Sequence, residues 1–231
     1  MTDASQNDRL ANDKPPSKAR RAVKGPLRRE AILNAALEVF SRDGYSAASV
    51  NTIAEIAEIT TAGLLHHFPN KVALLTGVLE RRDEESRKLT GAMLNSRHLY
   101  QLFNNLRTVN RANVNMAGVV RVFTVLNAES LTDTHPAWEW YQSRYQGLYK
   151  RLLTEFEALR SYGEVREDVD LLGVVQEIIA MMDGLQIQWL RFPDQLWLVE
   201  RFDVYLKRLE EDLRPKKRGL NHEPPNRQLS E

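Results

Sequence analysis

Apolar residues recur along most of this chain at the three- to four-residue spacing of an α-helix, and the two-residue alternation of a β-strand is absent. The first such run starts near Leu27, and Gly44 suits a left-handed C-terminal cap at its end. One face of this run carries Ile32, Leu33, Ala36, Leu37 and Phe40. The pattern predicts an all-α protein with about nine helices.

Three short helices are predicted after Gly44. Ser49 is a plausible N-cap for one that turns Ile53 and Ala54 inward, and Thr60 is a plausible N-cap for another that ends at Phe68. Asn70 is a plausible N-cap for the helix that follows. Only about three residues, 58–60, link the first two of these helices, a length that suits a helix-turn-helix.

Longer helical runs follow residue 90. Their apolar stripes lie within 99–109, 116–126, 138–159, 171–190 and 198–213. The two ends of the chain read differently, because they are polar and rich in proline. We therefore expect a disordered arm over 1–26, a helix-turn-helix domain over 27–78, a C-terminal helical bundle over 79–214 and a flexible tail over 215–231.

Composition narrows the class of protein. The chain has 231 residues, a formal net charge of +1 and no cysteine, which excludes a disulfide scaffold, a thiolate metal site and a cysteine nucleophile. The N-terminus lacks the apolar run of a secretion signal, and polar residues interrupt the most apolar stretch, 171–190. We expect a soluble, cytoplasmic protein.

Patterns typical of enzymes and cofactor sites are missing. The sequence has no glycine-rich phosphate loop, no G-x-S-x-G and no H-E-x-x-H. His66 and His67 are adjacent, so on a helix they point about 100° apart and are poorly placed to chelate one metal. We expect no catalytic residues, no metal and no cofactor.

The segment from Ser49 to Lys71, SVNTIAEIAEITTAGLLHHFPNK, resembles the DNA-binding segment of the TetR (tetracycline-repressor) family of transcriptional regulators. The likeness extends over about residues 29–79. The resemblance implies that the positions of Ser49, Thr61, Gly63, His66, His67 and Lys71 contact DNA. Four further residues are candidate DNA contacts. Thr60 can donate a hydrogen bond to DNA, and the small side chain of Ala62 allows close approach to it. Leu65 lies on the same helix, and Arg28 belongs to the basic arm.

Three features depart from the family pattern. Glu58 stands where the family usually has glycine, and Leu65 stands where it usually has an aromatic residue. Residues 30–85 hold four basic and nine acidic side chains, a net charge of −5 that opposes phosphate binding. Residues 14–29 hold seven basic side chains and no acid, so this arm either contacts DNA or is a solvated tail.

Aromatic residues gather between Pro136 and Tyr149, in a core, in a subunit interface or around a ligand pocket. Family members usually hold a small-molecule effector between the helices behind the DNA-binding domain. The candidate effector-binding residues are Phe123, Trp138, Tyr141, Tyr145 and Met182, and Asn127 and Glu129 are candidates to orient a polar group.

The last two helical runs show more apolar surface than one face needs, and a buried monomer core also fits them. The resemblance implies instead a homodimer through a four-helix bundle. The predicted interface residues are Leu171, Val175, Ile178, Met182, Leu185, Trp189, Phe202, Leu206 and Leu209. The family pattern implies a repressor released from a palindromic operator by its effector. A helical interaction protein that no longer binds DNA and a helical enzyme are the alternatives.

Overall fold

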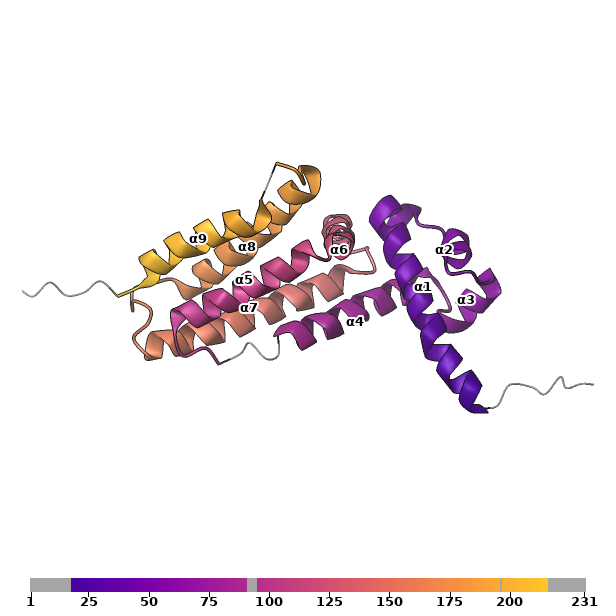
Figure 1. Cartoon of the computed structure of the whole chain (residues 1–231), viewed down its shortest axis with the longest axis horizontal. Helices are drawn as coiled ribbons and strands as arrows, with labels where there is room; N and C mark the ends of the chain where they lie inside the picture. Colours follow the sequence, from indigo (N-terminus) through magenta and orange to yellow (C-terminus); the bar gives the residue numbers. More distant parts are fainter. Residues whose placement is uncertain (1–17, 91–94, 196, 216–231) are drawn as a thin grey trace, which may run out of the picture. The chain divides into compact units, whose positions relative to one another are not determined.

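A computed structural model describes residues 18–90, 95–195 and 197–215 (Figure 1). Regular structure within these ranges is entirely helical, which confirms the all-α fold. The helices are α1 (Lys18–Ala47), α2 (Val50–Ile56), α3 (Thr61–His67), α4 (Lys71–Thr90), α5 (Leu99–Val114), α6 (Ala117–Glu129), α7 (Trp138–Ser161), α8 (Leu171–Arg191) and α9 (Leu198–Leu213). In the part of the chain described, none of them has the length and apolarity needed to cross a membrane.

The chain divides into two compact units, residues 1–78 and residues 79–231, here called unit 1 and unit 2. The division falls within α4, which contributes its first residues to unit 1 and the rest to unit 2. Unit 1 also contains α1, α2 and α3, and unit 2 contains α5 to α9.

Helix α1 begins earlier than the sequence predicts. It starts at Lys18 and has Pro26 inside it, so the prediction of a disordered arm is wrong for residues 18–26. Alanine, lysine and arginine favour a helix here, although proline lacks a backbone N–H. Residues 1–17 of the predicted arm lie outside the described residues. Gly44 has the predicted positive φ, 75°, but its ψ of 173° lies outside the left-handed helical region.

The short helices of unit 1 begin where their caps predict. The Thr60 hydroxyl accepts a hydrogen bond from the Gly63 N–H at 3.0 Å, and the Asn70 side chain accepts one from the Ala73 N–H at 2.8 Å. Ser49 precedes α2 in an extended conformation, and its side chain makes no capping hydrogen bond. The turn between α2 and α3 places Glu58 at φ 53°, the left-handed region that favours glycine.

The core of unit 1 joins all four of its helices through fully buried side chains. These are Ile32, Ala36, Val39 and Phe40 of α1, Ile53 of α2, Leu64 of α3, Phe68 after it, and Leu74 of α4. Gly77 permits a close approach on α4, because a Cβ there would lie 2.7 Å from the Phe68 ring and 3.2 Å from Leu33. This glycine therefore allows α4 to pack against Phe68.

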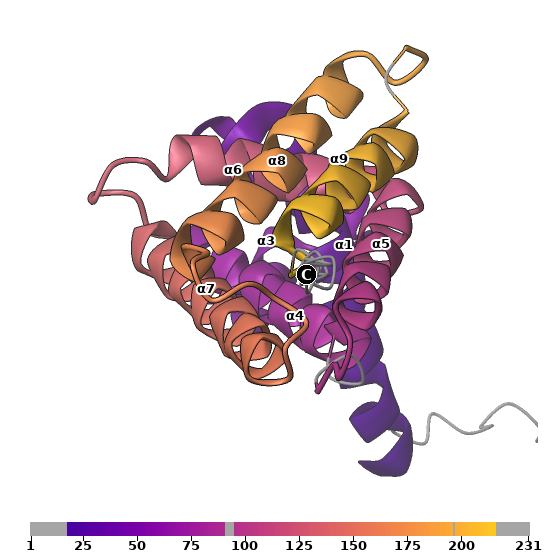
Figure 2. The ribbon, with the colours of Figure 1, turned by 90° about the vertical axis from the view of Figure 1, so that its left-hand side faces the viewer.

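Unit 2 is a helical bundle. Helix α9 lies between α5 and α8, and α7 packs on α8 (Figure 2). Helix α6 is seen nearly end-on where α5 and α7 are seen along their lengths, so it crosses them steeply (Figure 1). Phe103, Phe156, Val175, Ile178, Phe202 and Leu206 form the centre of the core.

The inward faces of α8 and α9 carry most of the residues predicted to form a dimer interface. Leu171, Val175, Ile178, Leu185, Phe202, Leu206 and Leu209 are all buried in the core of one chain. Side chains with almost no exposed area have no surface to offer a second copy. These seven residues pack within one chain, as the buried-core alternative expects, and the dimer interface itself stays a prediction. Met182 and Trp189 are partly buried against the same core.

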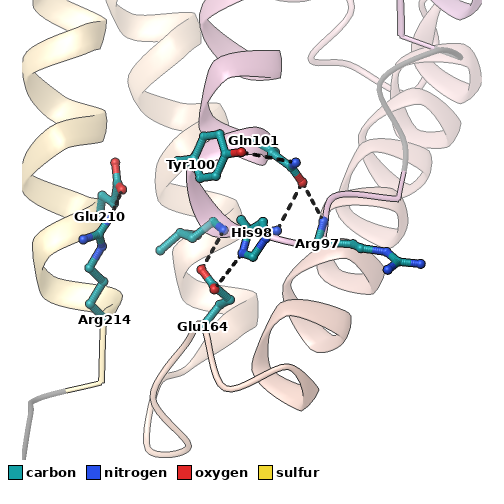
Figure 3. Close-up of polar contacts among 8 residues, drawn as sticks. Arg97, His98, Tyr100, Gln101, Glu164, Glu210 and Arg214 are labelled. Atoms are coloured by element: carbon teal, nitrogen blue, oxygen red, sulfur yellow. Dashed lines mark hydrogen bonds and ion pairs between the residues drawn. The ribbon is translucent and has the colours of Figure 1, made fainter.

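Polar contacts fasten the start of α5 to the connection between α7 and α8 (Figure 3). The Gln101 side chain accepts from the N–H groups of Arg97 and His98 at 2.8 and 3.2 Å. Glu164 accepts from the Leu99 N–H at 3.1 Å and pairs with His98 Nδ1 at 2.9 Å. One carboxylate thus caps a helix from a residue far along the chain.

Candidate nucleic-acid interface and ligand cavity

Helix α3 turns one face into the core of unit 1 and the other to solvent. Leu64 is fully buried, whereas Thr60, Ala62, Leu65 and His66 are exposed. These four exposed residues include no lysine or arginine, so the helix presents little positive charge. Thr60 and Ala62 are also small, so the helix presents little steric bulk there. Its short side chains suit close approach to a groove, and its hydroxyl and imidazole groups suit polar contacts.

Hydrogen bonds fix the orientation of the two threonines. Thr60 uses an acceptor lone pair on the Gly63 N–H, which leaves its own hydroxyl hydrogen available. Thr61 donates its hydroxyl hydrogen to the Asn51 side chain of α2 at 3.0 Å. The amide hydrogens of Asn51 then remain as donors beside α3. Asn51, which is exposed and lies one helix earlier, is not among the residues predicted to contact DNA.

Lys71, at the start of α4, is held by unit 1 itself. Its ammonium donates to the backbone oxygens of Tyr45, Ser46 and Ala48 at 3.0, 3.1 and 3.2 Å. It also lies 4.7 Å from the centre of the Tyr45 ring. An ammonium has three hydrogens, and three carbonyls receive them. A phosphate would have to take the place of one of these contacts, so the geometry departs from the simple phosphate contact predicted.

The remaining predicted DNA contacts have mixed surroundings. Ser49 is exposed before α2, and His67 is half-buried with its ring 5.8 Å from that of His66. Arg28 is exposed and borders an open hollow of about 530 Å³ that Glu55 and Glu58 also line. Two carboxylates beside α3 oppose phosphate binding through like-charge repulsion.

A larger cavity, about 620 Å³, lies within unit 2 among α4, α5, α6, α7 and α8. Phe123, Tyr141, Tyr145 and Met182, which were predicted as effector-binding residues, all line it, and so does Asn127. Trp138 and Glu129 do not line it, so the structure gives no support to these two predictions.

Trp138 was predicted to bind the effector, but it is Trp140 that packs behind the cavity wall. Its indole N–H donates to Asp83 at 3.0 Å, and its ring lies 6.0 Å from Phe123 and 4.8 Å from Tyr141. Residues two apart on a helix point to nearly opposite sides, because each residue turns the helix by about 100°. A gathering of aromatic residues in the sequence does not say which of two neighbouring tryptophans faces inward.

Polar side chains that the sequence analysis missed face the same cavity. Arg82, Arg144 and Asp183 line it. Arg144 pairs with Asp83 at 3.0 Å, whereas no described carboxylate lies within ion-pair distance of Arg82. Charged residues at positions of a helix that otherwise carry apolar side chains are the feature of the sequence that could have indicated these cavity residues.

A hydrogen-bonded chain ends on Asp183. The Asn127 amide donates to the Tyr145 hydroxyl at 2.9 Å, and that hydroxyl donates to Asp183 at 2.7 Å. Burial raises the pKa of Asp183, and Tyr145 counteracts part of that effect. Burial likewise raises the pKa of Tyr141 and of Tyr145, so both hydroxyls are neutral donors at neutral pH.

Two family models match the chain. One, described as bacterial regulatory proteins of the tetR family, matches residues 32–78. The other, described as the C-terminal domain of BetI-type transcriptional repressors, matches residues 116–210.

Curated relatives resemble the first unit. The transcriptional regulator RutR of Escherichia coli is 41% identical over 54 residues, which cover 23% of this chain and 26% of RutR. The repressor KstR of Mycolicibacterium smegmatis is 40% identical over 57 residues, which cover 25% of this chain and 28% of KstR. The matched stretch thus spans about a quarter of the length of these relatives.

Solved structures resemble the whole fold. A regulator from Saccharomonospora viridis in complex with choline aligns with a TM-score of 0.69 at 20% identity, covering 80% of this chain and 96% of that one. NalD of Pseudomonas aeruginosa, a repressor of a multidrug efflux pump, aligns with a TM-score of 0.67 at 21% identity, covering 84% and 99%. At these identities the likeness establishes the fold alone.

Proposed function

Since the chain belongs to the TetR family of bacterial regulatory proteins, we propose that it is a DNA-binding transcriptional regulator whose affinity for DNA changes when a small molecule binds. The observation that carries the proposal is the pairing of an exposed, polar recognition helix in unit 1 with an aromatic-lined cavity in unit 2. Both matched families consist of transcriptional regulators, which supports a regulatory role for this chain.

In unit 1, Thr60, Ala62, Gly63 and His66 contact the edges of bases, and Asn51 contributes amide donors beside them. Gly63 is supported by its packing, because a Cβ there would lie 3.2 Å from the Thr60 hydroxyl that caps the helix. The other predicted DNA contacts lie at the border of the surface that these residues form. They are Arg28, Ser49, Thr61, Leu65 and His67. Lys71 acts mainly by holding the turn after α1 in place.

In unit 2, the cavity binds the effector. A ligand there favours one conformation of the bundle, and it changes DNA affinity only by the difference between its affinities for the two conformations. Helix α4 contributes Lys71 to unit 1 and Arg82 to the cavity, so it is the element through which the two events are coupled. Release from the operator on ligand binding makes the chain a repressor.

The active form is a homodimer that binds a palindromic operator, with two α3 helices in successive major grooves. Its interface uses the outward faces of α8 and α9, because the inward faces are occupied by the core of one chain. The exposed apolar residues of these two helices that do not line the cavity are Leu172 and Val204.

Selection of bound fragments from a random-sequence duplex library by the full chain tests this proposal. We expect an enriched palindrome whose half-sites lie about one helical turn apart. His66→Ala with Thr60→Ala should lose the selected sequence preference, while Thr108→Ala, at an exposed position of α5, should keep it.

Failure to enrich any sequence would favour the interaction protein that no longer binds DNA. The acidic residues Glu55 and Glu58 beside α3 are the specific observation in favour of that alternative.

A further inference from the structure

The cavity of unit 2 is lined by both apolar and polar side chains. The apolar walls are formed by Leu102, Leu106, Leu148, Leu152, Ile178 and Ile179. The polar part of the lining includes a cluster of Arg82, Arg144, Tyr145 and Asp183, and other polar residues, Asn113 among them, also line the cavity. A ligand that fills this space needs an apolar body and one polar group, and the state of each polar side chain indicates which group that is.

Two described side chains of the lining have a buried atom without a hydrogen-bond partner: Arg82, a cation, and Asn113, whose Oδ1 is a neutral acceptor. The Nε of Arg82 is buried and makes no hydrogen bond, and among the described residues no carboxylate or carbonyl oxygen pairs with its guanidinium. The guanidinium carbon lies 5.6 Å from the centre of the Phe123 ring, which supplies no hydrogen-bond acceptor in the plane of the donors. A partly buried cation without an acceptor is costly, and an acceptor supplied by a ligand removes that cost.

The neighbouring groups are already satisfied. Arg144 pairs with Asp83, and Asp83 also accepts the Trp140 N–H. Asp183 accepts the Tyr145 hydroxyl, which in turn accepts the Asn127 amide. Burial lowers the pKa of Arg82, the positive charge of Arg144 lowers it further, and the carboxylates of Glu85 and Asp83 act in the opposite direction. Arginine stays protonated at neutral pH. Two guanidinium groups thus act on each other. Arg144 forms an ion pair with Asp83, whereas Arg82 feels the charges of Asp83 and Glu85 without forming an ion pair in the described part of the chain.

We infer that the effector is an apolar carboxylic acid whose carboxylate binds the guanidinium of Arg82, with its hydrocarbon part between the leucines and isoleucines of α5, α7 and α8. The inference rests on the proposed function of the cavity as the effector site. Arginine presents a planar fork of donors that matches a carboxylate. A phosphate dianion fits less well, because the apolar walls would remove water from two charges.

Three probes of matched shape test this inference: sodium 4-phenylbutyrate, 4-phenylbutan-1-ol and 4-phenylbutylamine. They share the hydrocarbon part and differ in charge. Binding to the full chain is measured by calorimetry and by the shift in Tm. We expect the carboxylate to bind about ten- to a hundred-fold tighter than the alcohol or the amine, as a charge-assisted contact to one buried arginine supplies.

Arg82→Gln should bring the affinity of the carboxylate down to that of the alcohol. Arg121→Gln is the matched control, because Arg121 is exposed on α6, carries the same charge and does not line the cavity. Arg82→Met provides a second readout. It should raise the Tm of the free protein, since it removes a cation without an acceptor, whereas an arginine with a structural role would lower it.

Four results would overturn the inference. They are equal binding of carboxylate and alcohol, absence of binding by the carboxylate, a carboxylate preference that survives Arg82→Gln, and tighter binding of the amine that Asp183→Asn abolishes. Selection of DNA by the wild-type chain separates this inference from the proposed function. A chain that selects DNA and responds to an amine refutes the carboxylate alone, and a chain that selects no DNA refutes the regulator.

Discussion

The ammonium of Lys71 donates to the backbone carbonyls of Tyr45, Ser46 and Ala48, and its removal takes one donor from each of them. We expect Lys71→Met to lower the free energy of unfolding of unit 1 by about 1–3 kcal/mol. Hydrogen exchange of the α2 and α3 amides in the full chain measures this loss. Arg42→Met is the control, because Arg42 is exposed and bonds only the adjacent Asp43.

A different result would restore Lys71 to the DNA surface. Unchanged exchange, together with a salt dependence of DNA binding that falls by about one unit, would mean that the ammonium binds a phosphate.

Glu58 has an unfavourable backbone conformation, because a φ of 53° is strained for a residue with a side chain. We expect Glu58→Gly to stabilise unit 1 by about 0.5–1 kcal/mol in urea unfolding. Glu58→Gln removes the same charge and leaves the backbone strained, so it should leave stability nearly unchanged. Both variants should bind DNA more tightly, because both remove a carboxylate beside α3.

Residue-scale predictions from the sequence succeeded where the cause is local. The caps Thr60 and Asn70 act on amides three residues away, so the sequence contains both partners. The contacts of Lys71 and the state of Arg82 depend on segments brought together by the fold. No spacing in the sequence indicates them.

Among the elements, α4 depends on one glycine for its packing. Gly77→Ala should destabilise unit 1 by about 1–3 kcal/mol, since the added methyl group meets the Phe68 ring. Gly147→Ala is the matched control, because nothing lies within 4 Å of its Cβ position in the interior of α7. Alanine is the better helix former there, so this control should stabilise the chain by up to about 1 kcal/mol. Equal effects of the two substitutions in thermal unfolding would remove Gly77 from its packing role.

The start of α5 gives unit 2 a dependence on acid (Figure 3). The hydrogen bond to His98 and the Leu99 N–H lower the pKa of Glu164 below its ordinary value. A carboxyl group whose pKa is lowered by folding stabilises the fold above its unfolded pKa, about 4.3, and loses that contribution as pH falls through its folded pKa.

We therefore expect the Tm difference between the wild-type chain and Glu164→Gln to shrink as pH is lowered from 6 to 3. Glu157→Gln, at an exposed position of α7, should show no such convergence. A Tm difference independent of pH would mean that the contribution of Glu164 does not depend on its charge.

The positions of the helices followed from apolar spacing, apart from the earlier start of α1, while the partner of each helix did not. The apolar stripes predicted on α8 and α9 are present, and their inward residues pack within one chain. An amphipathic pattern identifies a face that is buried, but it does not say whether the same chain or a second copy covers that face.

For the whole molecule, the buried inward stripes leave the outward faces of α8 and α9 for association. Val204→Glu should convert a dimer into a folded monomer, because Val204 is 47% exposed. Leu206→Ala, at a fully buried position two residues away, should instead destabilise the chain by about 2–5 kcal/mol. Sedimentation separates the first outcome from the second, which appears in thermal unfolding. A Val204→Glu chain that stays dimeric would place the interface elsewhere.

The division of the chain at residue 78 also bears on how such a protein changes over generations. The candidate DNA-contacting residues lie between Arg28 and Lys71, and the residues that line the large cavity lie between Arg82 and Arg191. No position belongs to both sets, so a substitution that alters the preferred operator leaves the chemistry of the cavity untouched. Recombination within α4 would join unit 1 of one protein to unit 2 of another. The preference for DNA and the preference for a ligand would then be inherited separately.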